Sequence, residues 1–236
     1  MTTTQRVAIV TGASQGIGEG LVVAYRKLGY RVVAVSRSIE ESDDPEVFTI
    51  QADLSRKGEG VRVVHETLAR FGRIDTLVNN AGIFVAKPFT DYNDEDYDAV
   101  TGINLRGFFD ISRGAVAAMV EQGGGHVVSV STTLVDHALT QVPSALASLT
   151  KGGLNAVTKS LAVEYASRNV RVNTVSLGVI RTPMHAPETH EFLAALHPVG
   201  RLGEIDEVVD AILYLENNRF VTGEVLHVDG GQSAGH

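Results

Sequence analysis

Three glycines follow an apolar run near the amino end of the sequence and lead into a helical pattern. They are Gly12, Gly16 and Gly18. The run 7–10 is small and β-branched without alternation, which is typical of a strand buried on both faces of a parallel sheet. From Ile17 to Gly29 the apolar positions recur at helical spacing. A glycine turn between strand and helix lets the backbone approach a diphosphate, so the stretch predicts a nucleotide site.

Histidines are the first candidates for proton transfer, because the imidazole pKa suits that role near neutral pH. His137 follows the expected strand 127–131 in a loop, where a solvated histidine is the favoured interpretation and proton transfer is the alternative. The segment 178–200 holds His185, His190 and His197. Their spacing to carboxylates is too loose to predict a metal site. The absence of cysteine excludes disulfides, thiolate metal sites and cysteine nucleophiles.

The elements that must position these residues alternate between strands and helices. Strands are expected at 31–36, 47–51, 76–79, 127–131, 171–176 and 225–228. Helices are expected at 61–71, 94–119, 144–167 and 204–215, the second bent near Gly102 and Gly107 and the third capped by Ser144. The segment 178–200 has three prolines and no clear period, so we expect a lid over a substrate pocket there.

Length and composition favour one domain, 1–236. The chain is 44% hydrophobic and shows no linker. Its formal charge of −8 argues against nucleic acid or an anionic membrane as the main partner, so local groups must hold an anionic cofactor. The first six residues, MTTTQR, are followed by an apolar run of only four residues, 7–10. This run is too short for a signal peptide or a membrane span. We therefore expect a cytoplasmic protein.

The ordered motifs resemble those of the short-chain dehydrogenase/reductases, single-domain Rossmann-fold enzymes that transfer hydride between NAD(P) and a carbonyl or alcohol. The segment 11–18, TGASQGIG, resembles the family's cofactor motif, 79–82 its Asn-Asn-Ala-Gly segment, and 223–231 its C-terminal strand and turn. The resemblance implies an α/β fold with a doubly wound parallel sheet of about seven strands flanked by helices. The cofactor-binding residues that it implies are Gly12, Ser14, Gln15, Gly16, Ile17, Gly18, Asp53, Leu54, Asn80, Ala81, Gly82, Lys151 and Thr182.

The end of the second strand bears on the choice between NAD and NADP. A carboxylate there would bind the ribose 2′-OH of NAD, whereas this sequence has Ser36 followed by Arg37. A guanidinium can form charge-assisted bonds to a 2′-phosphate, so NADP is expected over NAD. The nearby Glu40 and Glu41 leave a solvated loop arginine as the alternative.

The resemblance also implies a catalytic set of Asn, Ser, Tyr and Lys, of which three can be placed. Asn104 takes the asparagine position, Lys151 the lysine position, and Thr132 the hydroxyl position, with Ser131 as the alternative. The family's tyrosine, one helical turn before the lysine, corresponds to Ala147. Loss of a general acid costs on the order of 10²–10⁴ in rate.

Two functional hypotheses follow. The first is an NADP-dependent oxidoreductase with non-standard proton donation, acting on an unidentified carbonyl or alcohol. The second is a catalytically silent NADP-binding sensor or assembly subunit, because a ligand stabilises the fold whether or not chemistry follows. In both, the partners are small molecules and further copies of the chain. The family implies a homotetramer or homodimer packed through the helices near 94–119 and 144–167.

Overall fold

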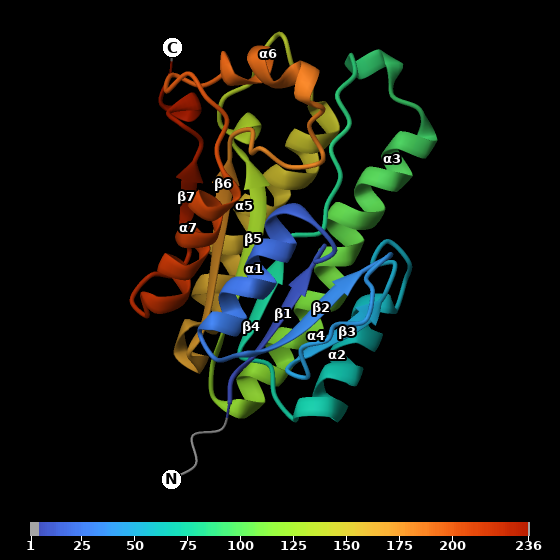
Figure 1. Ribbon diagram of the computed structural model, residues 1–236, viewed down its shortest axis with the longest axis vertical. Coiled ribbons are helices and arrows are strands. Elements are labelled where there is room, and N and C mark those ends of the chain that lie inside the picture. Colours follow the sequence, from blue (N-terminus) through green and yellow to red (C-terminus); the bar gives the residue numbers. More distant parts are fainter. Residues whose placement is uncertain (1–4, 236) are drawn as a thin grey trace.

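The computed structural model describes residues 5–235, in which seven parallel strands form one sheet between two layers of helices (Figure 1). The strands are β1 Val7–Thr11, β2 Arg31–Ser36, β3 Val47–Gln51, β4 Thr76–Asn79, β5 Gly125–Thr132, β6 Val170–Leu177 and β7 Val225–Val228. Their spatial order is β3-β2-β1-β4-β5-β6-β7. The order reverses between β1 and β4, where the carboxyl ends of a doubly wound sheet open a crevice. The predicted Rossmann-type fold is confirmed.

Helices cover the sheet because its strands are apolar on both faces. The helices are α1 Gly16–Lys27, α2 Glu59–Phe71, α3 Asp94–Thr101, α4 Phe108–Gln122, α5 Ala145–Tyr165, α6 His190–Ala194 and α7 Ile205–Asn217. One core contains Ile9 and Leu77 with residues of α2, α4 and α5. The other contains Val10 and Val78 with residues of α1 and α7, such as Ile212. Burying one such aliphatic side chain contributes roughly 1.5–3 kcal/mol.

The helix that the sequence predicts over 94–119 is interrupted as expected. Residues Gly102–Gly107 form a π-helical turn between α3 and α4. A Cβ on Gly102 would lie 3.2 Å from Ser55 Cβ, and a Cβ on Gly107 would lie 3.2 Å from the Leu54 carbonyl oxygen. Because both positions are glycine, the segment after β3 can pack directly against the π-helical turn. The bend therefore lies where these two segments come into close contact.

The remaining boundaries lie close to the predicted ones. Ser144 occupies the N-cap position of α5 as expected, but its side chain makes no capping hydrogen bond. Its carbonyl oxygen accepts from the Ser148 N–H instead, at 2.8 Å. Residues 5–235 contain no helix that is both long and apolar enough to cross a membrane.

Candidate active site

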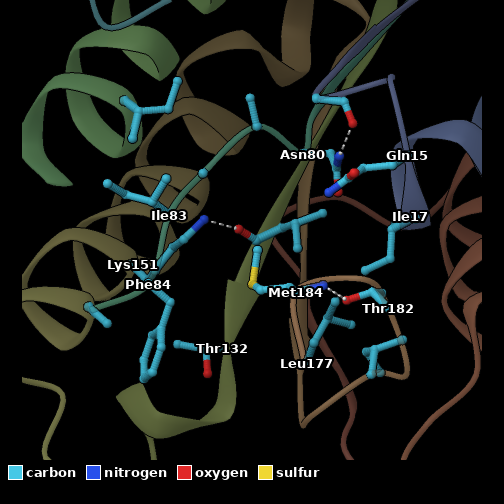
Figure 2. A pocket seen from close by; sticks show the side chains of 18 of the residues that line it. Gln15, Ile17, Asn80, Ile83, Phe84, Thr132, Lys151, Leu177, Thr182 and Met184 are labelled. Atoms are coloured by element: carbon cyan, nitrogen blue, oxygen red, sulfur yellow. Dashed lines mark hydrogen bonds between the residues drawn. The ribbon is translucent and has the colours of Figure 1, made fainter. Parts of the chain in front are cut away.

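A cavity of about 780 Å³ lies at the carboxyl ends of the strands, a volume typical of small-molecule sites. Its wall combines the glycine turn, the segment after β4, the end of β5 and one face of α5. Figure 2 shows Gln15, Ile17 and Asn80 on one side of it, Phe84 and Thr132 on the other. Of the residues expected to bind the cofactor, all except Gly18 line this cavity.

The glycine turn is built for close approach. Gly12 and Gly16 have φ of +67° and +60°, a region that side-chain-bearing residues rarely adopt. A Cβ on Gly18 would lie 2.1 Å from the Gly12 carbonyl oxygen, so Gly18 acts by packing the helix against the turn. α1 begins at Gly16, and the Gln15 side chain makes no capping bond to it. The N–H groups of its first turn are therefore left for a ligand.

Asn80 ties the segment after β4 to this turn. Its Nδ2 donates to the carbonyl oxygen of Thr11 at 2.9 Å. It also donates to the carbonyl oxygen of Gly12 at 3.2 Å (Figure 2). The Thr11 hydroxyl accepts from the N–H groups of Asn80 and Ala81, each at 3.0 Å. The Asn80 amide is thus used within the protein, and the residue positions the backbone of the cavity wall.

The far end of the cavity carries the groups expected at the adenosine part of the cofactor. Ser36 and the exposed Arg37 both line it. The Asp53 carboxylate accepts from the Ser55 hydroxyl at 2.6 Å and lies 3.3 Å from Arg56 Nε. The hydrogen bonds from Ser55, together with Arg56 and Arg37, hold the pKa of Asp53 below its usual range. Asp53 is therefore an ionised hydrogen-bond acceptor beside a cation.

Lys151 projects from α5 to the end of β5. Its Nζ donates to the Val130 carbonyl oxygen at 2.8 Å (Figure 2). A Cβ on Gly82 would lie 3.0 Å from this Nζ and 3.0 Å from Asn104 Oδ1, so only glycine leaves room for the lysine there. Removal of the ammonium from bulk water lowers the pKa of Lys151 to about 8.

Both candidate hydroxyls at the end of β5 line the cavity, together with Ala147. The Ser131 hydroxyl is buried and donates to the Lys151 carbonyl oxygen at 3.4 Å. The Thr132 hydroxyl accepts from the Leu134 N–H at 3.3 Å, a bond that leaves its proton for donation. Ala147 is 2% exposed and adds no polar group to the wall.

Asn104 does not line the cavity, although the resemblance places it in the catalytic set. It is buried in the π-helical turn, where its Oδ1 accepts from the Ile83 N–H at 3.0 Å. Its Nδ2 donates to the Ile83 carbonyl oxygen and to the Thr150 hydroxyl, each at 3.1 Å. The side chain therefore joins the segment after β4 to the turn of α5 that carries Lys151.

His185 is the one histidine among residues 5–235 that lines the cavity. Its Nδ1 lies 2.9 Å from the Ile180 carbonyl oxygen, to which it donates. The histidines elsewhere in the loops, His137, His190 and His197, do not line it. His197 is buried, and its Nε2 accepts from the Val179 N–H at 2.9 Å. In the described chain, no cluster of three acidic or histidine side chains could hold a metal ion.

Several apolar residues of the cavity wall could not be identified from the sequence, because they lie in segments without a helical or strand periodicity. They are Ile83, Phe84, Val142, Met184, Leu193 and Leu196. The segment expected to form a lid supplies the last three of these, and Figure 1 shows its helix α6 beyond the carboxyl ends of β5 and β6. Gln232 was also missed, and the Asp-Gly-Gly turn that precedes it is the signal that could have pointed to it.

Comparisons with known proteins agree with this architecture. The family model described as Enoyl-(Acyl carrier protein) reductase matches residues 12–233. L-xylulose reductase of Mus musculus is 36% identical over 96% of each chain. The 3-oxoacyl-[acyl-carrier-protein] reductase FabG of Thermotoga maritima is 34% identical over 96% of this chain and 97% of its own. The chain belongs to the short-chain dehydrogenase/reductase family, whose members are NAD(P)-dependent oxidoreductases.

Solved structures share the whole fold. The 3-ketoacyl-(acyl-carrier-protein) reductase of Brucella melitensis, complexed with NADH, has a TM-score of 0.89 at 29% identity, covering 98% of this chain and all of its own. ElxO with NADP bound has a TM-score of 0.91 at 27% identity and the same coverage. The solved relatives thus include one complex with each form of nicotinamide dinucleotide.

Proposed function

We propose that this protein binds NADP(H) and transfers hydride between it and a carbonyl or alcohol, with Ala147 at the position of the family's tyrosine. The observation that carries the proposal is the continuity of the cavity, whose wall extends from the glycine turn and Arg37 to Thr132 and Lys151. No tyrosine is among the residues 5–235 that line it.

The wall fits a dinucleotide along its length. The glycine turn and the N-terminus of α1 suit the diphosphate, since no side chain caps the first turn of that helix. Ser36 and Arg37 suit a 2′-phosphate, which favours NADP over NAD. Asp53 and Leu54 line the cavity and suit the adenine, and Thr182 also lines it and suits the nicotinamide carboxamide.

The residues at the other end have separate tasks. The bound cofactor supplies or accepts hydride at its nicotinamide. The Thr132 hydroxyl is placed to donate to a carbonyl oxygen, which orients the substrate and stabilises developing negative charge. Lys151 adds a positive charge beside the same strand end, held by the Val130 carbonyl oxygen. Asn104 is a positioning residue, since its side chain joins Ile83 of the cavity wall to Thr150 of α5.

Two measurements on the same preparation test the proposal. Fluorescence titration with NADPH and NADH measures binding, and consumption of NADPH with a panel of ketones, aldehydes and quinones measures turnover. We expect NADPH to bind more tightly than NADH and at least one carbonyl to be reduced. Failure to bind either dinucleotide would contradict the proposal.

The second candidate is a catalytically silent NADP-binding protein, and the observation that favours it is the lack of a phenol in the cavity wall. In this case the dinucleotide stabilises the native state or an assembly through binding alone. Tight NADPH binding, a raised melting temperature and no turnover with any carbonyl would favour this candidate over the oxidoreductase.

A further inference from the structure

Five ionisable side chains among the described residues line the cavity, and they divide into two groups. They are Arg37, Asp53, Asp98, Lys151 and His185. Arg37 and Asp53 follow β2 and β3 at the adenosine end. A proton donor for a substrate carbonyl must therefore come from the other three, from a hydroxyl, or from water.

Two of these three are poorly suited to donate. Asp98 is exposed to solvent on α3, at the edge of the cavity wall. His185 donates its Nδ1 proton to the Ile180 carbonyl oxygen, so its neutral form presents Nε2 as an acceptor. The Thr132 hydroxyl can hydrogen-bond an oxygen, but it is not an acid that gives up its proton near neutral pH.

Lys151 meets the geometric requirement. Its Nζ is held at 2.8 Å from the Val130 carbonyl oxygen, which uses one of the three N–H bonds of the ammonium. Gly82 opposite has no Cβ, and a Cβ there would lie 3.0 Å from Nζ. Ala147, one turn earlier on α5, has only a methyl group, so a substrate can enter the volume that a longer side chain would fill.

We propose that the Lys151 ammonium itself delivers the proton to the substrate carbonyl oxygen. This inference rests on the proposed oxidoreductase function. As the carbonyl carbon gains hydride, an Nζ–H bond breaks and an O–H bond forms. The alcohol leaves, Nζ keeps its electron pair as a neutral amine, and solvent returns the proton before the next turnover. Thr132 orients the oxygen by a hydrogen bond.

The acid strength of the lysine agrees with this role. Burial lowers its pKa to about 8, and a general acid works best when its pKa lies near the operating pH. The other ionisable side chains that line this end of the cavity are Asp98 on α3 and His185 in the segment after β6. No salt bridge to Lys151 occurs in the described part of the chain, so no carboxylate opposes loss of its proton.

The first test needs no turnover. Acetic anhydride acylates only the neutral amine of a lysine, so the extent of acylation of Lys151 at each pH, measured by peptide mass spectrometry, reports its free amine. The exposed Lys159 on the same helix serves as the control for reagent activity. We expect half-maximal reactivity of Lys151 near pH 8. A lysine that stays unreactive up to about pH 10 while Lys159 reacts would overturn the donor role.

The second test uses substitutions and an activated diketone or phenanthrenequinone as substrate. In the unchanged protein kcat should fall as pH rises through about 8, because the acid is lost. At saturating NADPH, Lys151→Ala should lose about 10²-fold or more in kcat and regain rate with added primary amines according to their pKa. Lys151→Arg keeps the charge but should stay slow, since guanidinium is too weak an acid. Lys159→Ala is the matched control and should be unaffected.

The outcomes separate the two proposals. An unchanged protein that binds NADPH but reduces no carbonyl overturns the oxidoreductase function and the donor role with it. Turnover that is independent of pH between about 7 and 9, or a folded, NADPH-binding Lys151→Ala that amines do not rescue, overturns the donor role alone. If Lys151→Ala fails to fold, Lys151→Met replaces it in the same rescue assay.

Discussion

At the scale of single residues, Ala147 distinguishes this site most clearly. Ala147→Tyr would place a phenol one turn before Lys151, on the face that lines the cavity. The neighbouring ammonium favours the phenolate and so lowers the pKa of a phenol, which makes it a better acid near neutral pH. We expect turnover of an activated ketone to rise, by up to about 10²–10⁴-fold.

The matched control is Ala147→Phe, which adds the ring without the hydroxyl. NADPH affinity and thermal stability must be measured for both variants, since either ring has to fit beside a residue that is 2% exposed. If both variants fold and bind NADPH but the tyrosine gives no gain over phenylalanine, the missing phenol does not limit turnover.

Arg37 should decide the cofactor preference. It lines the cavity next to Ser36 and is exposed, so its removal leaves the fold unchanged. Arg37→Ala should weaken NADPH binding by about 1.5–3 kcal/mol, roughly 10–150-fold, and spare NADH, because only NADPH carries the 2′-phosphate. Competitive titration of both dinucleotides measures the effect. Equal losses for the two, or tighter NADH binding in the unchanged protein, would remove Arg37 from this role.

At the scale of elements, the π-helical turn Gly102–Gly107 connects the cavity wall to α5. Its Asn104 bonds both backbone groups of Ile83 and the Thr150 hydroxyl. Asn104→Ala leaves buried polar groups without partners, which costs about 1–3 kcal/mol. We expect a lower denaturant midpoint and weaker NADPH binding, since the 80–83 segment loses its anchor.

Asn155→Ala on α5 is the comparison for that variant. Asn155 is also buried, but its Oδ1 has no hydrogen-bond partner, so its loss should cost less. Equal midpoints for the two variants would show that the Asn104 bonds do not hold the wall together.

The elements themselves could be predicted from sequence because each carries a local signal. The unbroken apolar run of β1 and the helical period of α7 have no competing interpretation, and Gly102 and Gly107 marked the bend. The roles of Asn80 and Asn104 could not be predicted, because they depend on hydrogen bonds to residues distant in the sequence. The apolar wall residues Phe84 and Met184 lie in loops, where the sequence has no period to indicate which side chains face inward.

At the scale of the whole molecule, α4, α5 and the π-helical turn before α4 expose apolar side chains. Leu105, Phe109, Leu149 and Val163 are 36%, 51%, 60% and 82% exposed. The homotetramer or homodimer that the family resemblance implies would bury such a surface against a second copy. Light scattering at micromolar concentration should give two or four times the protomer mass.

Substitution tests which surface is involved. Leu149→Glu with Val163→Glu should lower the mass, because a charge buried in an apolar interface is unfavourable. Val23→Glu on α1, at a residue 49% exposed, should leave it unchanged. A monomer mass for the unchanged protein would contradict the assembly altogether.

A buried polar network at the amino ends of the strands, opposite the cavity, joins helices and sheet through Glu216 of α7. Its carboxylate accepts from Tyr30 at 2.7 Å, from Thr76 at 3.0 Å and from His126 Nδ1 at 2.9 Å. His126 Nε2 lies 3.1 Å from Asn173 Nδ2, a donor, so the imidazole is neutral with its proton on Nδ1.

The network makes the fold sensitive to acid. Burial lowers the pKa of His126 below its ordinary 6.5. Burial alone would raise the pKa of Glu216, but the hydrogen bonds from His126, Tyr30 and Thr76 outweigh it and hold the pKa below its ordinary 4.5. Both folded-state values are depressed, so the stability from these groups is present above the unfolded values. It is lost as pH falls, first below 6.5 and further below 4.5.

Glu216→Gln should reduce this acid sensitivity and lower stability at neutral pH. The amide brings an NH₂ group among hydrogen-bond donors and removes the charge, which costs about 1–3 kcal/mol. Urea midpoints at a fixed protein concentration, measured at about pH 7.5, 6 and 4.5, report both effects. Glu224→Gln, at an exposed glutamate after α7, controls for the loss of a negative charge and should change neither. A pH dependence in Glu216→Gln as steep as in the unchanged protein would show that other groups govern acid unfolding.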